Sequence, residues 1–102
     1  MAWETESLHY AEVRSRLLHC ADLIQEVSPE NVLELGCGTG VLRSLLHQCC
    51  PASVYYGCDV SRSALRVITD TRPDELAHCD LNSDALPFNQ SLFDVLVCSG
   101  VL

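Results

Sequence analysis

Apolar residues recur every three or four positions along the first part of the chain, between Leu8 and Val27. The positions that form this stripe are Tyr10, Val13, Leu17, Ala21, Ile24 and Val27. Steps of three and four place side chains on one face of an α-helix, so the pattern predicts an amphipathic helix over 8–27 with this stripe buried. Ser28 and Pro29 end the predicted helix, because proline restricts the residue before it and cannot continue the helical hydrogen bonds.

The rest of the chain alternates short apolar runs with helical spacing. Runs bounded by turn residues predict four strands, at 32–35, 54–58, 76–79 and 93–98. Helical spacing follows the first run from Gly40 to the break at Cys49-Cys50-Pro51, and follows the second from Ser61, a helix-capping residue, to Ile68. Strands that alternate with helices indicate an α/β fold, with a doubly wound parallel sheet and right-handed crossovers.

The last predicted strand, 93–98, is the most apolar of the four and has no predicted helix after it. An open parallel sheet normally has both faces covered, and an apolar edge strand favours association with other chains. We therefore expect the sequence to be the N-terminal part of a larger domain, with an incomplete sheet and self-association through the open edge. A natural short form, or a half-domain completed by a partner chain, is the alternative.

The charge balance is acidic. The 102 residues include 14 acids and six basic residues, all of them arginine, which gives a formal net charge of −8. No stretch is basic enough to follow a phosphate backbone, and this disfavours nonspecific electrostatic binding of nucleic acid. No apolar run approaches the roughly 18–20 residues that cross a bilayer, and the acidic N-terminus does not resemble a signal peptide. We expect no membrane association and a cytoplasmic location.

Seven cysteines lie mostly within apolar runs. An odd number of cysteines without a secretory signal favours buried thiols over a disulfide framework. The four histidines show no metal-ligand spacing, no cysteine pair forms a CxxC motif, and the adjacent Cys49 and Cys50 do not have the geometry of a metal site. The sequence therefore predicts no metal.

A glycine-rich turn, Glu34-Leu35-Gly36-Cys37-Gly38-Thr39-Gly40, joins the first predicted strand to the helix after it. Glycines allow a tight turn at positive φ and let a ligand approach the backbone closely. The helix that begins near Gly40 points its amides and the positive end of its dipole at such a ligand. Asp59 ends the next strand, 19 residues after Gly40. Ligands of open α/β sheets bind outside the carboxyl ends of the strands, where a carboxylate can accept hydrogen bonds from both hydroxyls of a ribose.

Four segments in this order resemble the motifs of the class I S-adenosylmethionine-dependent methyltransferases, which have a Rossmann-like sheet. The segments are VLELGCGTG (32–40), YGCDVS (56–61), CDL with LPF (79–81 and 86–88) and SLFDVLVC (91–98). The resemblance covers nearly the whole chain from Val32 onward. It divides the chain into an N-terminal helix, 1–30, and the cofactor-binding strands, 31–102.

The resemblance implies S-adenosylmethionine as the cofactor and assigns the glycine-rich turn to its methionine part. Gly36, Cys37, Gly38 and Gly40 would wrap that part of the cofactor, with backbone groups near its amine. Glu34 would order the turn.

The resemblance also assigns residues that follow the other strands. Asp59 would hold the ribose, and Val60 would lie against the adenine. Asp80 would accept a hydrogen bond from the adenine amino group, while the Leu81 amide meets the ring. Cys98 would lie near the methionine chain and the methyl donor.

A methyltransferase is the activity that the resemblance implies, and this chain would carry its cofactor-binding half. Methyl transfer from a sulfonium is a direct displacement, so positioning and electrostatics supply most of the acceleration. No general base is evident, and the catalytic residues stay unassigned. The sequence after Cys98, Ser99-Gly100-Val101-Leu102, lacks the Pro-Pro-aromatic signature that resembles methyltransferases of exocyclic amines in nucleic acids. We therefore favour a small molecule or a protein as the methyl acceptor.

Two other interpretations compete with this one. Nicotinamide and flavin dinucleotide folds carry G-x-G-x-x-G, whereas here Gly40 lies two residues after Gly38 instead of three, which disfavours them. The alternative function is a non-catalytic S-adenosylmethionine-binding or interaction module, completed by a partner chain. The intact set of Glu34, three glycines, Asp59 and Asp80 favours the enzyme, because an interaction module has no physical need for all six.

Overall fold

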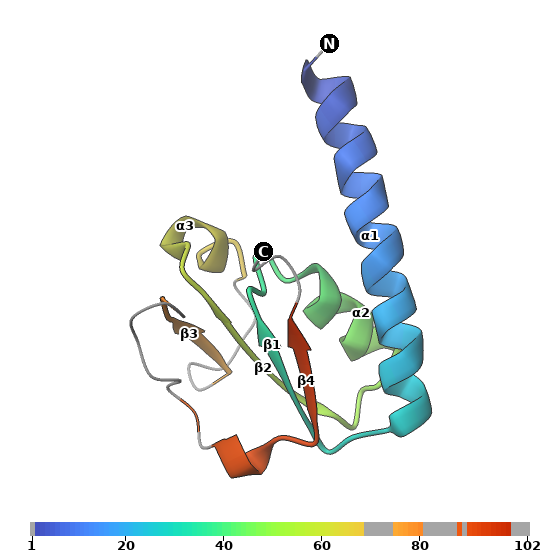
Figure 1. Cartoon of the computed structure of the whole chain (residues 1–102), viewed down its shortest axis with the longest axis vertical. Coiled ribbons are helices and arrows are strands. Elements are labelled where there is room, and N and C mark those ends of the chain that lie inside the picture. The colour runs from blue at the N-terminus through green and yellow to red at the C-terminus, as the bar shows by residue number, and fades with distance from the viewer. Residues whose placement is uncertain (1, 69–74, 81–87, 89, 99–102) are drawn as a thin grey trace.

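Four parallel strands form one sheet in the order β3-β2-β1-β4 in the computed structural model (Figure 1). The strands are β1 (Asn31–Leu35), β2 (Val54–Asp59), β3 (Leu76–His78) and β4 (Val95–Cys98). The structure describes residues 2–68, 75–80, 88 and 90–98, with side chains from Arg14 onward except that of Gln90. This sheet, with helices alternating between its first three strands, confirms the predicted Rossmann-like α/β fold.

The helices are α1 (Ala2–Val27), α2 (Val41–Cys49) and the short α3 (Arg62–Leu65), with a 3₁₀ helix, η1 (Gln90–Leu92), before β4. The N-terminal half of α1 extends beyond the edge of the sheet where the strands end (Figure 1). Among the described residues, none of these helices is both long and apolar enough to cross a bilayer.

From Leu17 onward the apolar stripe of α1 packs into the core beside α2 as predicted, except at its last position, whereas the side chains of Tyr10 and Val13 lie outside the described residues. Leu17, Ala21 and Ile24 are buried, but Val27 is 63% exposed, so its predicted burial is wrong. At about 100° per residue Val27 lies to one side of the stripe, in the last turn of the helix. The helix ends there because Ser28, which precedes a proline, takes a left-handed φ of 51° and its amide bonds back to the Ile24 carbonyl.

The main core lies between the sheet and the layer that α1 and α2 form. Val32 of β1 and Tyr55 of β2 are register partners, so both point toward that layer. The buried core residues are Leu17, Ala21, Ile24, Val32, Cys37, Leu42, Leu45, Leu46, Cys50 and Tyr55. Packing of this cluster fixes α2, and with it the turn that leads into α2, against the end of β1.

The opposite face of the sheet carries an aromatic group. The Tyr56 ring meets Phe88 and Phe93 edge-on, with ring centroids 5.5 and 5.2 Å apart. Leu33, the register partner of Tyr56, is buried on this face, whereas Leu96 of the edge strand β4 is 58% exposed. The described sheet therefore ends at an edge strand with an accessible apolar side chain, as the sequence predicts.

Three predicted elements are shorter in the structure, and one of them is the strand 76–79, which ends at His78. The predicted strand 93–98 begins at Val95; the Asp94 carboxylate just before it accepts hydrogen bonds from the Glu30 and Asn31 amides, and the Asp94 amide donates to the Asn31 carbonyl. The predicted helix 61–68 has α-helical form only over α3 and continues as a turn to Ile68, whose amide bonds to the Leu65 carbonyl. Ser61 caps α3 as predicted, because its hydroxyl accepts from the Ala64 amide at 3.2 Å.

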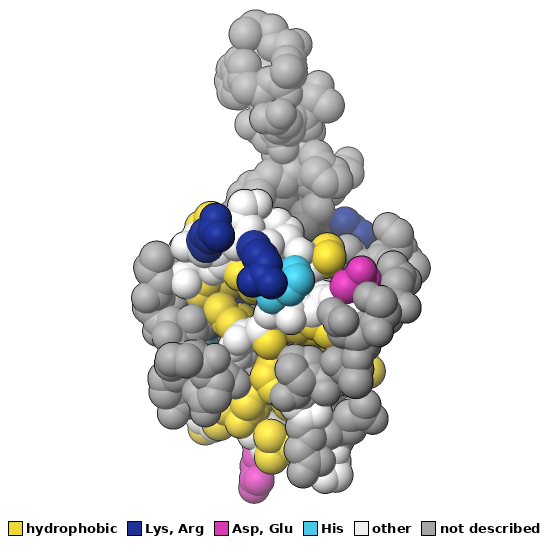
Figure 2. All heavy atoms as spheres, turned by 90° about the vertical axis from the view of Figure 1, so that its left-hand side faces the viewer, with side chains coloured by type: hydrophobic (Ala, Val, Ile, Leu, Met, Phe, Trp, Pro, Cys, Tyr) yellow, Lys and Arg dark blue, Asp and Glu magenta, His cyan; other side chains and the backbone are white. Residues whose placement is uncertain are grey.

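The surface on the α3 and β3 side mixes basic and apolar side chains. Figure 2 shows arginine and histidine side chains gathered above a band of hydrophobic ones on this face. Arg62, Arg66 and His78 are exposed, and so are Val60 (61%) and Val67 (63%), which flank α3. Val60 is an apolar side chain in solvent directly after β2, where ligands of open α/β sheets bind.

All seven cysteines are thiols that form no disulfide. Four are buried and two are half-buried, as predicted, whereas Cys98 at the end of β4 is exposed. Within the part of the chain that the structure describes, no group of three or more His, Cys, Asp or Glu side chains could hold a metal ion.

Candidate functional site

The turn between β1 and α2 places three glycines in the left-handed region. Gly36, Gly38 and Gly40 have φ values of 76°, 56° and 86°, which L side chains rarely adopt. The amides of Gly36 and Cys37 both donate to the Cys58 carbonyl, at 2.8 and 3.0 Å. The turn is therefore folded back onto the carboxyl end of β2. We call residues 36–40 the glycine loop.

The surroundings of the last two glycines differ. A Cβ built at Gly38 would have no heavy atom within 4 Å, so the described structure leaves open space beside this residue. A Cβ at Gly40 would lie 2.9 Å from Cδ1 of Ile68, closer than real Cβ contacts. Gly40 is also the N-cap of α2 and provides no side-chain cap, so the first amides of the helix are left for water or a ligand.

Asp59 ties the loop to the end of β2. Its Oδ2 accepts a hydrogen bond from the Gly38 amide at 2.8 Å, and its Oδ1 accepts one from the Ser61 amide, also at 2.8 Å. The carboxylate is half-buried. It therefore fixes the middle of the glycine loop and the start of α3 at the same time.

The other predicted site residues lie at the carboxyl edge of the same sheet. Cys98 ends β4 beside Leu35, its register partner immediately before the glycine loop. Asp80 follows β3 and is half-buried, and the amide of the preceding Cys79 donates to the Asp59 carbonyl at 3.0 Å. The strand order thus brings the ends of all four strands to one edge (Figure 1). Leu81 lies outside the described residues.

Glu34 is buried at the base of the loop. Only 1% of Glu34 is exposed, and its Oε1 accepts a hydrogen bond from the Tyr55 hydroxyl at 2.5 Å. Burial, and next the Glu34 carboxylate, raise the pKa of Cys37 to about 12. The same two causes hold the pKa of Tyr55 well above its usual range. At neutral pH both Cys37 and Tyr55 keep their protons, so Cys37 is not a reactive thiolate.

Sequence reasoning found the loop and its acids but missed the buried polar residues beneath them. Arg43 of α2 is 4% exposed and lies 3.8 Å from the Glu75 carboxylate, which precedes β3. An arginine between Leu42 and Leu45, on the apolar side of a helix, is the one sequence signal that indicates a buried partner.

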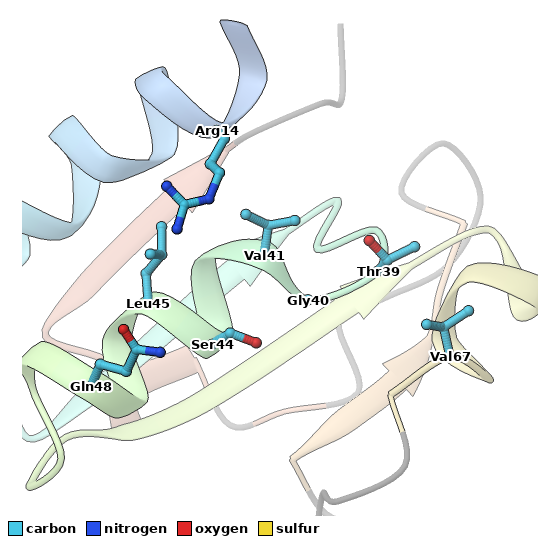
Figure 3. A pocket seen from close by; sticks show the side chains of 8 residues that line it. All are labelled: Arg14, Thr39, Gly40, Val41, Ser44, Leu45, Gln48 and Val67. Carbon is cyan, nitrogen blue, oxygen red and sulfur yellow. The ribbon is translucent and has the colours of Figure 1, made fainter. Parts of the chain in front are cut away.

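A hollow of about 310 Å³ opens beside α2 (Figure 3). Its lining residues are Arg14, Thr39, Gly40, Val41, Ser44, Leu45, Gln48 and Val67. It shares only Thr39 and Gly40 with the glycine loop, and neither Asp59 nor Asp80 lines it. Among the described residues, Gly40 is the one predicted site residue that lines this hollow, so the hollow is separate from the rest of the predicted site.

Comparison with known proteins agrees with the motifs. Residues 33–102 match the model of a family described as a methyltransferase domain. The chain belongs to this methyltransferase family. The resemblance to the class I S-adenosylmethionine-dependent methyltransferases is thus confirmed for the family, together with the cofactor that this family uses.

Individual relatives show the same similarity. The chain is 40% identical over 72 residues to trans-aconitate 2-methyltransferase of Escherichia coli O1:K1 / APEC, an alignment that covers 68% of this chain and 28% of that protein. It resembles the solved structure of the plantazolicin methyltransferase BpumL with S-adenosylhomocysteine (TM-score 0.67, 16% identity, 93% of this chain and 39% of that one). The same enzyme with a monoazolic substrate analogue gives a TM-score of 0.65 at 16% identity, covering 91% and 38%. The chain spans less than half the length of these relatives.

Proposed function

We propose that this chain binds S-adenosylmethionine at the carboxyl edge of its sheet and forms the cofactor-binding part of a methyltransferase. The observation that carries this proposal is the glycine loop held by Asp59: three left-handed glycines, open space beside Gly38, and a carboxylate 2.8 Å from the Gly38 amide. Such a loop lets a ligand approach the backbone closely, as a cofactor held by its amino acid part requires.

The residue roles follow from the chemistry of each group. A carboxylate offers about four lone-pair positions, so Asp59 can bond the Gly38 and Ser61 amides and still accept from both ribose hydroxyls. Val60, exposed beside it, offers an apolar surface for the adenine. Asp80 and Leu81 would meet the adenine edge, and Cys98 would lie near the methyl donor.

The bound cofactor would supply a methyl group on a sulfonium, which an acceptor attacks by direct displacement. The chain's own contribution is then to hold and orient the cofactor and to keep water from it. The names of the relatives, trans-aconitate 2-methyltransferase and plantazolicin methyltransferase, refer to different compounds, so the similarity carries no single acceptor to this chain. A small molecule or a protein as acceptor, and a cytoplasmic location, stay predictions.

The alternative is a module that binds S-adenosylmethionine or a partner chain without catalysis. One observation favours a partner: β4 is an edge strand of the described sheet, with Leu96 58% exposed. Self-association through that edge stays a prediction. Analytical ultracentrifugation tests this prediction, because a chain that is monomeric at all concentrations would contradict self-association.

The test of the proposed function is a calorimetric titration of the chain with S-adenosylhomocysteine, with NAD as the control ligand. We expect saturable binding of the first and none of the second. Absence of S-adenosylhomocysteine binding by a folded sample, judged by circular dichroism, would contradict the proposal.

A further inference from the structure

A buried polar cluster lies next to the glycine loop, on the face of the sheet that α1 and α2 cover. Its four side chains come from four parts of the chain: Glu34, Arg43, Tyr55 and Glu75, which are 1%, 4%, 2% and 8% exposed. Burying charged and polar groups costs several kcal/mol unless partners compensate them. Apolar packing alone would fill this space at lower cost, so the cluster calls for another explanation.

Tyr55 lies at the centre of the cluster. Side chains two apart on a strand share a face, and the Tyr55 phenol extends along β2 over Gly57. A Cβ built at Gly57 would lie 2.8 Å from the Tyr55 hydroxyl oxygen and 3.0 Å from its Cε1. Gly57 is the register partner of Glu34 on β1, so a phenol in this position reaches the Glu34 carboxylate, to which it donates its hydrogen bond.

The same point touches the glycine loop. The Cβ built at Gly57 would also lie 3.1 Å from Cβ of Cys37, so the Tyr55 hydroxyl and the Cys37 side chain flank one position. Glu34 and Cys37 both contribute, after burial, to the raised pKa of Tyr55. The phenol therefore bonds the acid at the base of the loop, on the side of Gly57 where the first side chain of the loop also lies.

The remaining two residues close the cluster on the side of β3. The Arg43 guanidinium lies 3.8 Å from the Glu75 carboxylate, and its positive charge opposes the rise in the pKa of Tyr55. The Glu75 carbonyl accepts a hydrogen bond from the Gly57 amide at 2.7 Å. Glu75, which precedes β3, is thus bound both to Arg43 of α2 and to Gly57 of β2.

We propose that Tyr55 is a positioning residue of the cofactor site, acting through Glu34. Its hydroxyl holds the Glu34 carboxylate at the base of the glycine loop, and the Arg43–Glu75 pair ties α2 to the segment before β3. The inference rests on the proposed function, because it says that affinity for the cofactor depends on a phenol that does not touch it. Positioning of this kind lowers the cost of ordering the loop on binding.

The test compares Tyr55→Phe with Tyr56→Phe, which removes the same oxygen from the next residue on the opposite face of β2. Calorimetric titration of the full chain with S-adenosylhomocysteine should show a five- to twentyfold loss of affinity for Tyr55→Phe and less than twofold for Tyr56→Phe. In a Glu34→Gln background the Tyr55→Phe change should cost less than twofold, because the hydroxyl acts through that carboxylate. A role in packing alone would give the same loss in both backgrounds.

Amide hydrogen exchange of the ligand-free chain gives a second measurement. Exchange at 36–40 should be faster in Tyr55→Phe than in the unchanged chain, and unaltered in Tyr56→Phe. If Tyr55→Phe does not fold, Glu75→Gln takes its place, with an expected loss of affinity of at least threefold.

The outcomes separate the two proposals. If the chain without substitutions does not bind S-adenosylhomocysteine, the proposed function is overturned. The comparison of amide exchange at 36–40 then still tests the role of Tyr55. An unchanged chain that binds, with Tyr55→Phe within twofold of it, overturns the inference alone. The inference is also overturned if Tyr55→Phe causes the same loss of affinity in the original and the Glu34→Gln backgrounds, or if it leaves amide exchange at 36–40 unaltered.

Discussion

The Asp59 carboxylate accepts a hydrogen bond from the Gly38 amide at 2.8 Å, across the gap between the ends of two neighbouring strands. This bond holds the loop after β1 against the end of β2 without any ligand. An acid at the end of β2 therefore has two tasks in this chain. It shapes the loop that would receive the cofactor, and it presents the remaining lone pairs to that cofactor.

Replacing Asp59 by Ala should affect both tasks. We expect the free energy of unfolding to fall by about 1–3 kcal/mol, because hydrogen bonds to the Gly38 and Ser61 amides are lost. Affinity for S-adenosylhomocysteine should fall at least tenfold. Asp22→Ala, at an exposed position of α1, is the control and should change stability by less than about 0.5 kcal/mol. A loss of affinity below about threefold, roughly 0.7 kcal/mol, would contradict the ribose role.

Replacing Gly57 by Ala should strain the buried cluster. The new Cβ would lie 2.8 Å from the hydroxyl of Tyr55, a ring that is 2% exposed and cannot move into solvent. We expect a loss of about 1–3 kcal/mol of unfolding free energy in urea. The same change in a Tyr55→Phe background should cost less, because the nearest atom is gone. Equal costs in the two backgrounds would show that the Tyr55 hydroxyl does not limit this position.

Asp94 should be structural, as its bonds to the Glu30 and Asn31 amides at 2.9 and 3.1 Å indicate. Asp94→Ala should lower the free energy of unfolding by about 1–2 kcal/mol, since both amides lose a charged acceptor. Asp94→Asn keeps an acceptor oxygen and should cost less than half as much. Affinity for S-adenosylhomocysteine should stay within twofold for both variants. A larger effect on binding than on stability would assign Asp94 to the site.

Stability should fall at alkaline pH. Burial raises the pKa of Cys37 to about 12 and that of Cys58 to about 11, from a usual value of 9.0. Above pH 9 the unfolded chain loses protons that the folded chain keeps, so the equilibrium shifts toward unfolding as pH rises from 9 to about 12. The urea midpoint should therefore be lower at pH 10 than at pH 8. A double variant with alanine at both cysteines should show a smaller difference, and an unchanged or rising midpoint in the original chain would contradict these pKa shifts.

The order of elements could be predicted because local sequence patterns specify each element. Each strand is an apolar run between turn residues, and the glycine spacing after β1 leaves the backbone few choices. Asp59 could be placed at the ligand edge because β2 ends there and parallel strands share one edge. The burial of Leu17, Ala21 and Ile24 followed from helical spacing alone.

The misses at β4 and at Tyr55 have a common cause in contacts between distant residues. The start of β4 at Val95 depends on Asp94 bonding amides more than 60 positions away. The Tyr55–Glu34 bond depends on which strand lies beside β1 and on a glycine at 57 that lets the phenol lie along β2. Periodicity assigns Tyr55 to the core, and only the packed sheet shows what its hydroxyl reaches.

Binding of S-adenosylmethionine by the glycine loop can be observed residue by residue in an ¹H–¹⁵N correlation spectrum recorded during titration with S-adenosylhomocysteine. We predict saturable shifts of the amides at 36–40 and at Asp59 and Val60. The amides of Ser44 and Gln48, which line the separate hollow beside α2, should stay unchanged. Unshifted loop amides, or shifts confined to that hollow, would contradict the account.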